Sequence, residues 1–210
     1  MTIPETIDAL RARFGEAIGA SAEFRGQTGI NVAREKIVEV CQFLKTGAAF
    51  EVLNDVCVVD NFGDEPRYCV DYLLYSMSKR HFLRLKVGVP EGDGIVDSIT
   101  GVWKGANWLE REAFDMHGVK FRGHPNLKRI LMWEGYPYHP MRKDFPLAGL
   151  PADLPEYGKD AGSAATANML GGPFVTAPGT QRTIDREPRQ YDTAAERTDS
   201  LARPTKEEAV

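Results

Sequence analysis

The most regular pattern in the chain is an alternation of hydrophobic and polar residues between residues 81 and 89. The hydrophobic positions are Leu83, Leu85, Val87 and Val89, and the positions between them are Arg84, Lys86 and Gly88. Successive side chains of a strand point to opposite faces of a sheet, so this strand is predicted to bury one face and expose the other. A second strand-forming run, residues 67–77, precedes it, and three turn residues separate the two. The two runs are therefore predicted to form an antiparallel hairpin.

Three other segments repeat their hydrophobic residues every three or four positions, which predicts amphipathic helices. The first starts at Thr2 in a capping box, with Glu5 three residues later, and is predicted to end at Gly19. The second covers residues 34–46 and the third residues 104–117, and a glycine follows each of them. The predicted buried positions are Ile7, Leu10, Phe14 and Ile18 in the first, Ile37, Val40, Cys41 and Leu44 in the second, and Ala106, Leu109, Ala113 and Met116 in the third.

Further short strands are predicted at residues 22–25 and 27–32, and a longer one at residues 50–61. A short helix capped by Asp97 or Ser98 is predicted just before the third long helix. This order of elements predicts an α+β fold, with a mostly antiparallel or mixed sheet and flanking helices. The predicted division is an α+β core domain at 1–122, an irregular docking segment at 123–150 and an extended, irregular C-terminal tail at 151–210.

The C-terminal tail differs from the rest of the chain in composition. It contains ten acidic and seven basic residues, a net charge of −3, and its few large hydrophobic residues follow no period. Such a segment cannot bury enough apolar surface to offset the entropy lost when its backbone is ordered. We therefore predict that the tail has no core of its own and becomes ordered only against a partner.

Several functional classes are disfavoured by the composition. The net charge is −4 and no basic stripe with interleaved aromatic residues is present, which argues against nucleic acid as a partner. No run of about 18 apolar residues and no secretory signal is evident, so any contact with a membrane is predicted to be indirect. Neither a Gly-x-Gly-x-x-Gly turn nor a phosphate-binding loop occurs. The odd number of cysteines predicts reduced, core-type thiols at Cys41, Cys57 and Cys69.

Residues 110–147 stand out because charged, aromatic and proline residues are concentrated there. The segment holds three of the four histidines of the chain, and its acidic and basic residues nearly balance. A mixed surface of this kind, rich in aromatic side chains, suits contact with another protein. On the predicted helix, Glu112 and Asp115 are three residues apart and are expected to share a face. We interpret these carboxylates as members of ion pairs rather than as an acid–base couple.

Five groups of residues in this segment carry a family resemblance: Glu110-Arg111-Glu112, Asp115, Gly123-His124-Pro125, Lys128-Arg129-Ile130-Leu131 and Arg142-Lys143-Asp144-Phe145-Pro146-Leu147. In these residues the chain resembles the C-subunit of NADH-quinone oxidoreductase, the respiratory complex I. Residues 67–91 and 97–108 also resemble that family, so the resemblance covers roughly residues 20–150. One departure stands out, because Met116 and His117 occupy two positions at which the family usually has large apolar residues.

The resemblance implies a non-redox structural subunit in the hydrophilic arm of the complex, peripheral to the cytoplasmic side of the bacterial inner membrane. It implies that this chain has no catalytic, cofactor-binding or metal-binding residues, because FMN, the iron–sulfur clusters and quinone belong to partner subunits. The complex transfers electrons from NADH to quinone and translocates protons. The nearest partners implied are the D-subunit, which carries the quinone site, and the iron–sulfur subunits B and I. The implied interface residues are Glu110, Arg111, Glu112, Asp115, His124, Lys128, Arg129, Arg142, Lys143, Asp144 and Phe145.

Two alternatives remain open. One is the equivalent subunit of a related membrane-bound hydrogenase or ferredoxin-dependent complex. The other is a stand-alone metal hydrolase that uses His117, His124 and His139, since catalytic zinc sites take three protein ligands. Their spacings of seven and fifteen residues match neither a helical histidine pair nor a zinc finger, and no Cys-x-x-Cys accompanies them. We therefore expect the imidazoles of His124 and His139, each followed by a proline, to bond local carbonyl groups or a partner chain.

Overall fold

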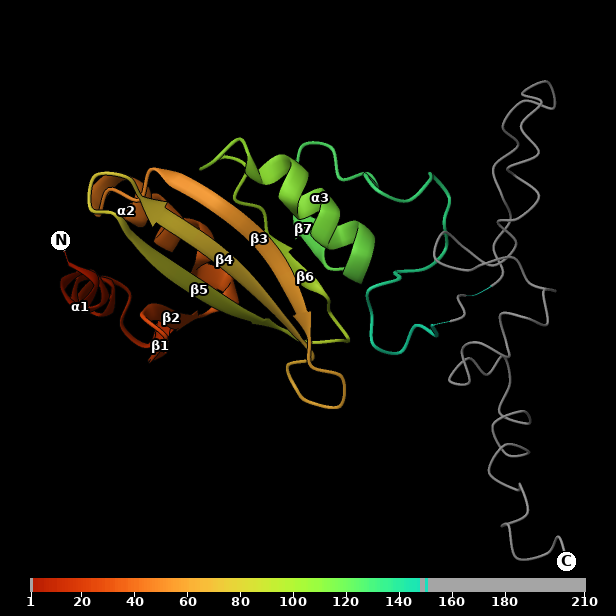
Figure 1. Cartoon of the computed structure of the whole chain (residues 1–210), viewed down its shortest axis with the longest axis horizontal. Coiled ribbons are helices and arrows are strands. Elements are labelled where there is room, and N and C mark those ends of the chain that lie inside the picture. The colour runs from red at the N-terminus through yellow and green to blue at the C-terminus, as the bar shows by residue number, and fades with distance from the viewer. Residues whose placement is uncertain (1, 148–149, 151–210) are drawn as a thin grey trace, which may run out of the picture. The chain divides into compact units, whose positions relative to one another are not determined.

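The computed structural model describes residues 2–147 and 150 of the chain. Residues 2–134 and 139–143 form one compact unit, and the remaining described residues belong to a second. The first unit contains a five-stranded mixed sheet, a two-stranded sheet and three α-helices, which confirms the predicted α+β class (Figure 1). In the second unit, the ring of Tyr138 packs against Tyr136 and Phe145, with ring centroids 5.6 and 6.0 Å apart. The C-terminal tail predicted at 151–210 lies outside the described residues.

The large sheet has the strand order β1-β2-β5-β4-β3. Its strands are β1 (Ile18–Phe24), β2 (Gln27–Val32), β3 (Val52–Asp60), β4 (Tyr68–Ser76) and β5 (His81–Val89). β4 pairs antiparallel with both β3 and β5, so the hairpin predicted at residues 67–89 is confirmed. β2 pairs parallel with β5, and β1 runs antiparallel to β2. The two-residue turn between β1 and β2 has positive φ at Arg25 and Gly26, a backbone twist that matches the twist of the strands.

The three α-helices are α1 (Ile3–Phe14), α2 (Ile37–Gly47) and α3 (Ala106–His117). Helix α1 starts at the predicted capping box, in which the Thr2 side chain accepts from the Glu5 amide and the Glu5 side chain accepts from the Thr2 amide. It ends before Gly15, not at the predicted Gly19, because Gly15 leaves the helical conformation with a φ of 55°. Ile18, predicted as the last buried residue of this helix, is instead the buried first residue of β1.

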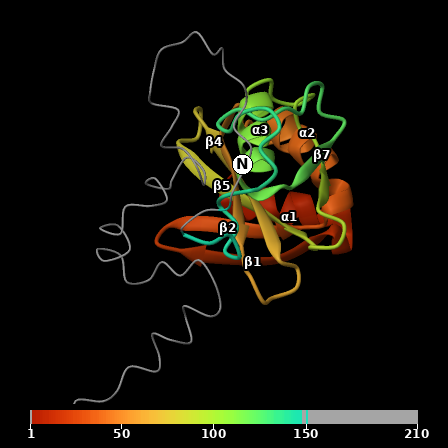
Figure 2. The ribbon, with the colours of Figure 1, turned by 90° about the vertical axis from the view of Figure 1, so that its right-hand side faces the viewer.

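One face of the large sheet is covered by the helices and forms the core. Short 3-10 turns, η1 (Gly15–Ala17) and η2 (Arg34–Lys36), lead into β1 and α2, and Figure 2 shows α1 and α2 on the same side of β4 and β5. The hydrophobic residues predicted to alternate along β5 are all buried on this face. Their buried neighbours from the other strands and the helices include Ile30, Val32, Val70, Tyr72, Leu74, Leu10, Ile37, Val40, Cys41 and Leu44. Of the three free thiols, Cys41 is the core thiol that was predicted, whereas Cys57 and Cys69 are only half-buried.

The region after β5 differs most from the sequence prediction. Residues 95–97 form β6 (Ile95–Asp97), which pairs parallel with β7 (Lys120–Arg122). The predicted short helix after Asp97 is replaced by a turn, in which the amides of Val102 and Trp103 donate to the carbonyl of Ile99. The chain therefore leaves β6, passes through α3 and returns along β6. In the part of the chain that the structure describes, no helix is both long and apolar enough to cross a bilayer.

Candidate functional site

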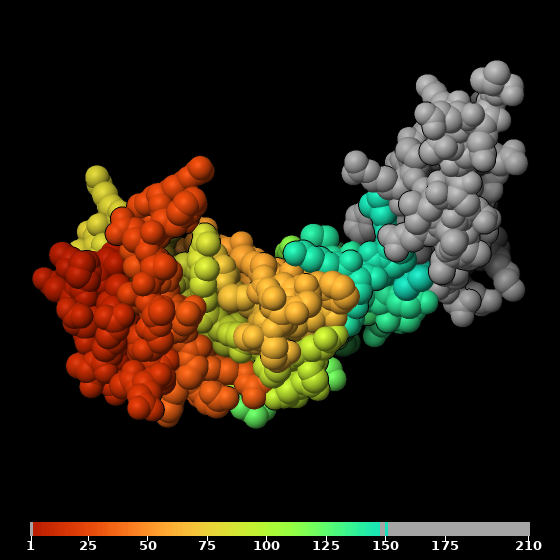
Figure 3. Space-filling view, turned by 90° about the horizontal axis from the view of Figure 1, so that it is seen from below, coloured from red at the N-terminus to blue at the C-terminus, as the bar shows by residue number. Residues whose placement is uncertain are grey.

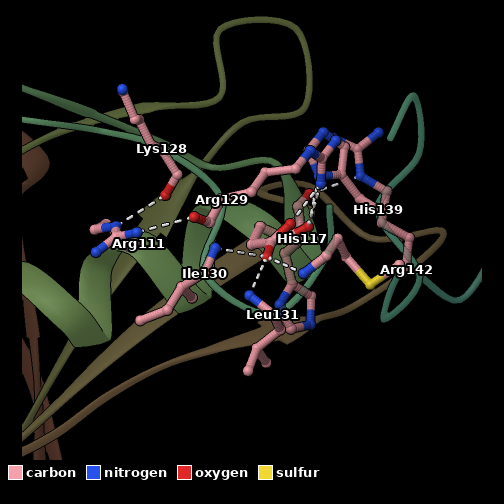
Figure 4. Close-up of polar contacts among 10 residues, drawn as sticks. Arg111, His117, Lys128, Arg129, Ile130, Leu131, His139 and Arg142 are labelled. Atoms are coloured by element: carbon pink, nitrogen blue, oxygen red, sulfur yellow. Dashed lines mark hydrogen bonds and ion pairs between the residues drawn. The ribbon is translucent and has the colours of Figure 1, made fainter. Parts of the chain in front are cut away.

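A buried carboxylate, Asp115, organises the surface loop that follows β7. Asp115 lies on α3, and its exposed fraction is 0%. Its Oδ2 accepts hydrogen bonds from the amides of Ile130, Leu131 and Met132, at 3.0, 2.8 and 2.8 Å. Its Oδ1 pairs with Nη1 of Arg129 at 2.5 Å. We call residues 128–132 the clamped loop, because one side chain holds three consecutive amides of it (Figure 4).

Asp115 is held as an anion although it is buried. Burial by itself raises the pKa of a carboxyl group. Here the amide of Met132, the guanidinium of Arg129 and the amides of Leu131 and Ile130 outweigh that effect, and the pKa of Asp115 lies below its ordinary value. These donors occupy the lone pairs with which a carboxylate binds water. The group is therefore suited to holding a loop in place and not to transferring protons.

Arg111 attaches the start of the clamped loop to α3. Its Nε donates to the carbonyl oxygen of Lys128 at 3.0 Å, and its Nη2 donates to that of Arg129 at 2.9 Å. Arg129 in turn donates to the backbone carbonyl of Asp115 at 3.2 Å. The carbonyl groups at the start of the loop and the amide groups at its end are therefore all hydrogen-bonded to side chains of α3. Such two-sided bonding fixes the path of a segment that has no regular secondary structure.

The clamped loop and α3 present apolar side chains to solvent. Ile130 is 37% exposed, Leu131 is 62% exposed, and Trp108 on α3 is 59% exposed. Large apolar side chains on a fixed backbone are typical of protein contact sites, because little further ordering is needed when a partner binds. Exposed Lys128 adds a positive charge to the same loop. The clamped loop and α3 therefore present an apolar surface whose backbone is already fixed.

Residues 139–142 close the C-terminal end of α3. Nδ1 of His139 donates to the carbonyl oxygen of Asp115 at 2.9 Å, and Nε of Arg142 donates to that of His117 at 2.6 Å. The last carbonyl groups of a helix have no partner inside it, so these side chains supply the missing donors. Burial lowers the pKa of His139, so its ring is neutral at pH 7 and the Nδ1–H tautomer fits this bond. The expectation that His139 bonds a local carbonyl is confirmed.

The other two histidines of this segment are also engaged locally or buried. His124 bonds the carbonyl of Asn107 through Nε2 at 3.1 Å and accepts from the amide of Asn126 at Nδ1. Burial lowers the pKa of His117 to about 4, so this ring is neutral as well. Among residues 2–147 and 150, no three His, Cys, Asp or Glu side chains are grouped so as to hold a metal ion.

A second carboxyl group on α3, Glu110, is also 0% exposed. Its Oε2 accepts from the hydroxyl of Ser98 at 2.6 Å and its Oε1 from the amide of Ile99 at 2.8 Å. Burial raises the pKa of Glu110 to about 7, because these two neutral donors do not compensate for lost water. Glu110 lies in the interior and links α3, which carries the exposed Trp108, to the turn that follows β6.

Sequence reasoning did not identify a buried ion pair between Asp60 and Arg67. Arg67 binds both carboxylate oxygens of Asp60, at 2.9 and 3.0 Å, and the side chains are only 2% and 3% exposed. The amide of Lys143 donates to the same carboxylate at 2.8 Å, which ties the predicted docking segment to the end of β3. The sequence held an indication of this pair, because Asp60 is the last residue of β3 and Arg67 immediately precedes β4, its antiparallel neighbour.

The eleven predicted interface residues separate by exposure. Glu112, Lys128, Lys143 and Asp144 are exposed, Arg111, His124, Arg129, Arg142 and Phe145 are half-buried, and Glu110 and Asp115 are buried. The expectation that Glu112 and Asp115 share a face is wrong, because α3 turns Glu112 to solvent and Asp115 to the interior. The ion pair predicted for Arg129 is made inside the chain, with Asp115. The two buried carboxyl groups therefore support the surface from beneath.

Comparison with known proteins connects these features to one family. Residues 30–151 match the family described as the respiratory-chain NADH dehydrogenase, 30 kDa subunit. The C-subunit of the NADH-quinone oxidoreductase of Geobacter sulfurreducens is 48% identical over 141 residues, which cover 67% of this chain and 87% of the relative. The second C-subunit of the NADH-quinone oxidoreductase of Rhizobium meliloti is 42% identical over 159 residues, which cover 75% of this chain and 87% of that protein.

Solved structures agree with the sequence comparison. The trypsin-resistant fragment (1-134) of Nqo5 is 28% identical, with a TM-score of 0.54 over 60% of this chain and all of that chain. A chain of the archaeal membrane-bound sulfane sulfur reductase, a respiratory membrane complex, shares the fold at 18% identity and a TM-score of 0.60, over 69% of this chain and 85% of that chain. The family match covers β2 to the end of the docking segment and so includes the clamped loop. By family model, identity and fold, the chain belongs to the family of the 30 kDa subunit of respiratory-chain NADH dehydrogenase.

Proposed function

We propose that the chain is a non-redox structural subunit in the hydrophilic arm of a proton-translocating NADH-quinone oxidoreductase, on the cytoplasmic side of the membrane. In this role it supports electron transfer from NADH through FMN and iron–sulfur clusters to quinone, all of which other subunits bind. The observation that carries the proposal is the clamped loop, a surface segment whose backbone is fixed by the buried carboxylate of Asp115.

A fixed apolar surface is what a structural subunit requires. Leu131 and Trp108 are exposed although both are large and apolar. Contact residues of this kind dominate the binding energy of interfaces when they enter a pocket on the partner. Because Arg111 and Asp115 already order the loop, its side chains are positioned before the partner arrives. Association then loses less conformational entropy than it would with a flexible loop.

The acidic groups near this surface are not arranged for chemistry. A general acid or base must reach a reacting atom. Asp115 is saturated by four donors, and Glu110 is buried against Ser98 and Ile99. The arrangement of both carboxyl groups supports a structural role over the alternative of a metal hydrolase that uses the three histidines.

The proposed partners are the D-subunit, which carries the quinone site, and the iron–sulfur subunits B and I. The proposed contact residues are those of the predicted set that reach solvent: Arg111, Glu112, His124, Lys128, Arg129, Arg142, Lys143, Asp144 and Phe145. Glu110 and Asp115, which belong to the same predicted set, shape this surface without touching the partner.

A second assignment has one observation in its favour. The archaeal sulfane sulfur reductase chain has the same fold, so the scaffold is used in more than one respiratory membrane complex. The runner-up is therefore the equivalent subunit of a related membrane-bound hydrogenase or ferredoxin-dependent complex. The electron-input subunits that co-purify with a tagged chain from its host distinguish the two assignments.

The test replaces one exposed apolar side chain of the clamped loop by a charge. We expect Leu131→Asp to reduce the amount of assembled complex strongly, since loss of a contact hot spot costs about 2 kcal/mol, roughly a 30-fold change in affinity. Met77→Asp is the matched control, because Met77 is 64% exposed and Leu131 is 62% exposed, and Met77 lies at the end of β4, outside the docking surface. Both variants should fold, since both side chains face solvent.

Two readings decide the outcome, the yield of complex in native gels and the NADH-to-quinone turnover per assembled complex. A structural role predicts that Leu131→Asp lowers the yield and leaves the turnover per complex near normal, while Met77→Asp changes neither. Full assembly with a small fraction of normal turnover would instead mean that this surface takes part in the chemistry. Metal and flavin analysis of the purified chain is an independent check, and stoichiometric iron, zinc or FMN kept after dialysis would refute the non-redox role.

A further inference from the structure

Strand β1 forms an open edge of the large sheet. The opposite edge strand, β3, packs against α3, whereas all residues of β1 after Ile18 are exposed. In the described part of the chain, the Ile18 amide donates to the carbonyl of Gly15, and the other backbone hydrogen bonds of residues 18–24 are made with β2. In the space-filling view of Figure 3, the β1–β2 hairpin, in red to orange, lies at the molecular surface. Its sequence, IGASAEF, has no proline or lysine, residues with which proteins usually protect exposed edges.

The register of the hairpin shows which backbone groups are free to bind. Phe24 and Gln27 flank the two-residue turn and form its closing pair, which exchanges two hydrogen bonds. Hydrogen-bonded and non-hydrogen-bonded pairs alternate in an antiparallel ladder. The pair Ala22–Gly29 is therefore bonded, and the N–H and C=O groups of Glu23 and Ser21 point away from β2. These are the groups that an added strand would use.

Both faces of β1 are flanked by hollows in the surface. On the helix side, β1 and α1 line a groove that includes Ser21, Glu23 and Arg11. On the open side, Ala20, Ala22, Phe24, Arg84 and Lys86 line a groove of about 230 Å³, which we call the basic groove because its lining has no acidic residue. Successive side chains of an added strand would enter these two grooves in turn.

Lys86 makes the basic groove electrostatically selective. Asp71 lies opposite Lys86 on β4 but is near Arg84, at 3.8 Å, and Lys86 makes no ion pair within residues 2–147. Its side chain lies over Gly29 of β2, where Cε would be 3.5 Å from an added Cβ. Strands are about 4.8 Å apart, and Ala22 between this lysine and the edge is short. An acidic side chain on an added strand has a clear path over Ala22 to the ammonium group.

We propose that β1 is a docking site for an extended, acidic segment of another subunit, which adds to the large sheet as a sixth strand. The inference rests on the proposed function, because it takes the partner to be a subunit of the same complex. Backbone hydrogen bonds to Ser21 and Glu23 supply affinity, and the basic groove selects a strand with an Asp or Glu on the face it covers. The clamped loop and β1 then form separate contacts.

A second copy of this chain fits the edge less well. Two β1 strands paired antiparallel about a two-fold axis would make one continuous sheet with both basic grooves on the same face. The β1 strand of a second copy would place Ala20, Ala22 and Phe24 on that face, so it would bring no acidic side chain to either basic groove. A partner with alternating acidic residues meets the same edge with opposite charge.

The test is a photo-reactive benzophenone side chain in place of the exposed ring of Phe24, which leaves Ala22 short, irradiated in the assembled complex of the full chain. We expect a cross-link to an extended segment of another subunit that has an acidic residue within two positions of the linked one. A cross-link to a second copy, to residues 151–210 of the same chain, or to no protein would each overturn the proposal.

Two matched pairs of variants, each combined with the position-24 probe, identify the contacts. Lys86→Glu reverses the free charge in the basic groove and should reduce the cross-link yield on the order of tenfold. Lys79→Glu makes the same change of charge at the exposed β4–β5 turn and should leave it within twofold. Glu23→Pro removes an outward N–H and should abolish the cross-link, whereas Glu23→Ala keeps that N–H and should retain it. Equal cross-link yields within both pairs would contradict strand addition. If Glu23→Pro does not fold, the comparison of Lys86→Glu with Lys79→Glu alone decides whether strand addition occurs.

The outcomes separate this inference from the proposed function. If the chain is not a subunit of such a complex, the unmodified chain recovers no other subunit. If the complex assembles normally and remains sensitive to Leu131→Asp, but the probe at position 24 reaches no other subunit, then the proposed function stands and only the strand-addition site is wrong.

Discussion

Two carboxyl groups on the same helix, Glu110 and Asp115, are equally inaccessible to solvent but have opposite pKa shifts. Burial favours the neutral acid in both. Asp115 has a guanidinium and three amides as donors, and its pKa is lowered. Glu110 has only a hydroxyl and one amide, and its pKa is raised to about 7. The number and charge of the donors decide the shift, and sequence spacing alone did not reveal either set.

Removing the charge of Asp115 should destabilise the protein without touching its surface. In Asp115→Asn the side chain keeps one acceptor for three loop amides, and the ion pair with Arg129, which is only 14% exposed, is lost. We expect a loss of about 3 kcal/mol in the free energy of unfolding, measured by urea denaturation at pH 7. Glu112→Gln, on the solvent side of α3, is the control and should change it by less than about 0.5 kcal/mol. Equal stability of the two variants would show that the clamp is not structural.

Glu110 should make stability fall as the pH rises toward neutrality. Its folded-state pKa is raised, so its stabilising contribution is complete below the unfolded pKa of 4.5 and is lost as the pH rises through about 7. Glu110→Gln mimics the protonated form and does not titrate. Relative to the parent chain, this variant should gain up to about 3 kcal/mol between pH 4.5 and 7.5. The stability of the variant must be compared with that of the parent chain at each pH. The reason is that His117, with its pKa lowered to about 4, makes the stability of both proteins rise with pH over much of the same range. A constant difference across this range would mean that Glu110 is not protonated in the fold.

At the scale of elements, the end of α3 depends on a single glycine. Gly118 has a φ of 82°, and a Cβ there would meet the His139 ring at 2.7 Å and also the Arg142 guanidinium. These are the side chains that satisfy the last carbonyl groups of the helix. The left-handed turn and the return of residues 139–142 therefore require glycine for two separate reasons, conformation and space.

Replacing Gly118 and a second glycine separately by alanine distinguishes the cost of the backbone conformation from the cost of the lost space. Gly123 has nearly the same φ, 81°, but nothing within 4 Å of an added Cβ. Gly123→Ala should cost about 1 kcal/mol from backbone strain alone. Gly118→Ala should cost at least about 2 kcal/mol, because His139 and Arg142 must also move. Thermal unfolding of the two variants measures the difference, and equal costs would show that the packing of residues 139–142 on α3 is loose.

Local patterns in the sequence predicted the elements that depend on neighbours close in the chain. The capping box at Thr2, the β4–β5 hairpin and the C-terminal end of α3 follow from periodicity and cap chemistry, and the structure confirms them. The parallel pairing of β2 with β5 and of β6 with β7 was not predicted, because such pairs are joined by long connections that leave no local signal. The buried pair of Asp60 and Arg67 was not predicted, because charged residues are mostly exposed and nothing in the local pattern marks this pair as buried.

At the scale of the whole molecule, the described residues form two compact units, and the helices and strands described for the first lie within residues 3–122. Its core is formed by residues from α1 to β7. A domain of about 150 residues buries roughly 68–70% of its unfolded surface, which is sufficient for independent stability. The composition of residues 151–210, with ten acidic and seven basic residues, predicts that they add no second core.

Truncation after Leu150 tests this division between core and tail. We expect the shortened chain to unfold cooperatively, with a midpoint within about 2 °C of the full chain, because the composition of the tail predicts no contribution to the core. The full chain should be cut by trypsin first within residues 151–210, where six basic residues that do not precede a proline offer sites, and should be protected there once the complex is assembled. The shortened chain should also enter the complex less efficiently than the full chain in a competition between the two, since a segment without its own core is expected to contribute by contacting partners. A large fall in the unfolding midpoint would place part of the tail in the folded core, and equal entry of the two forms would remove its proposed role in assembly.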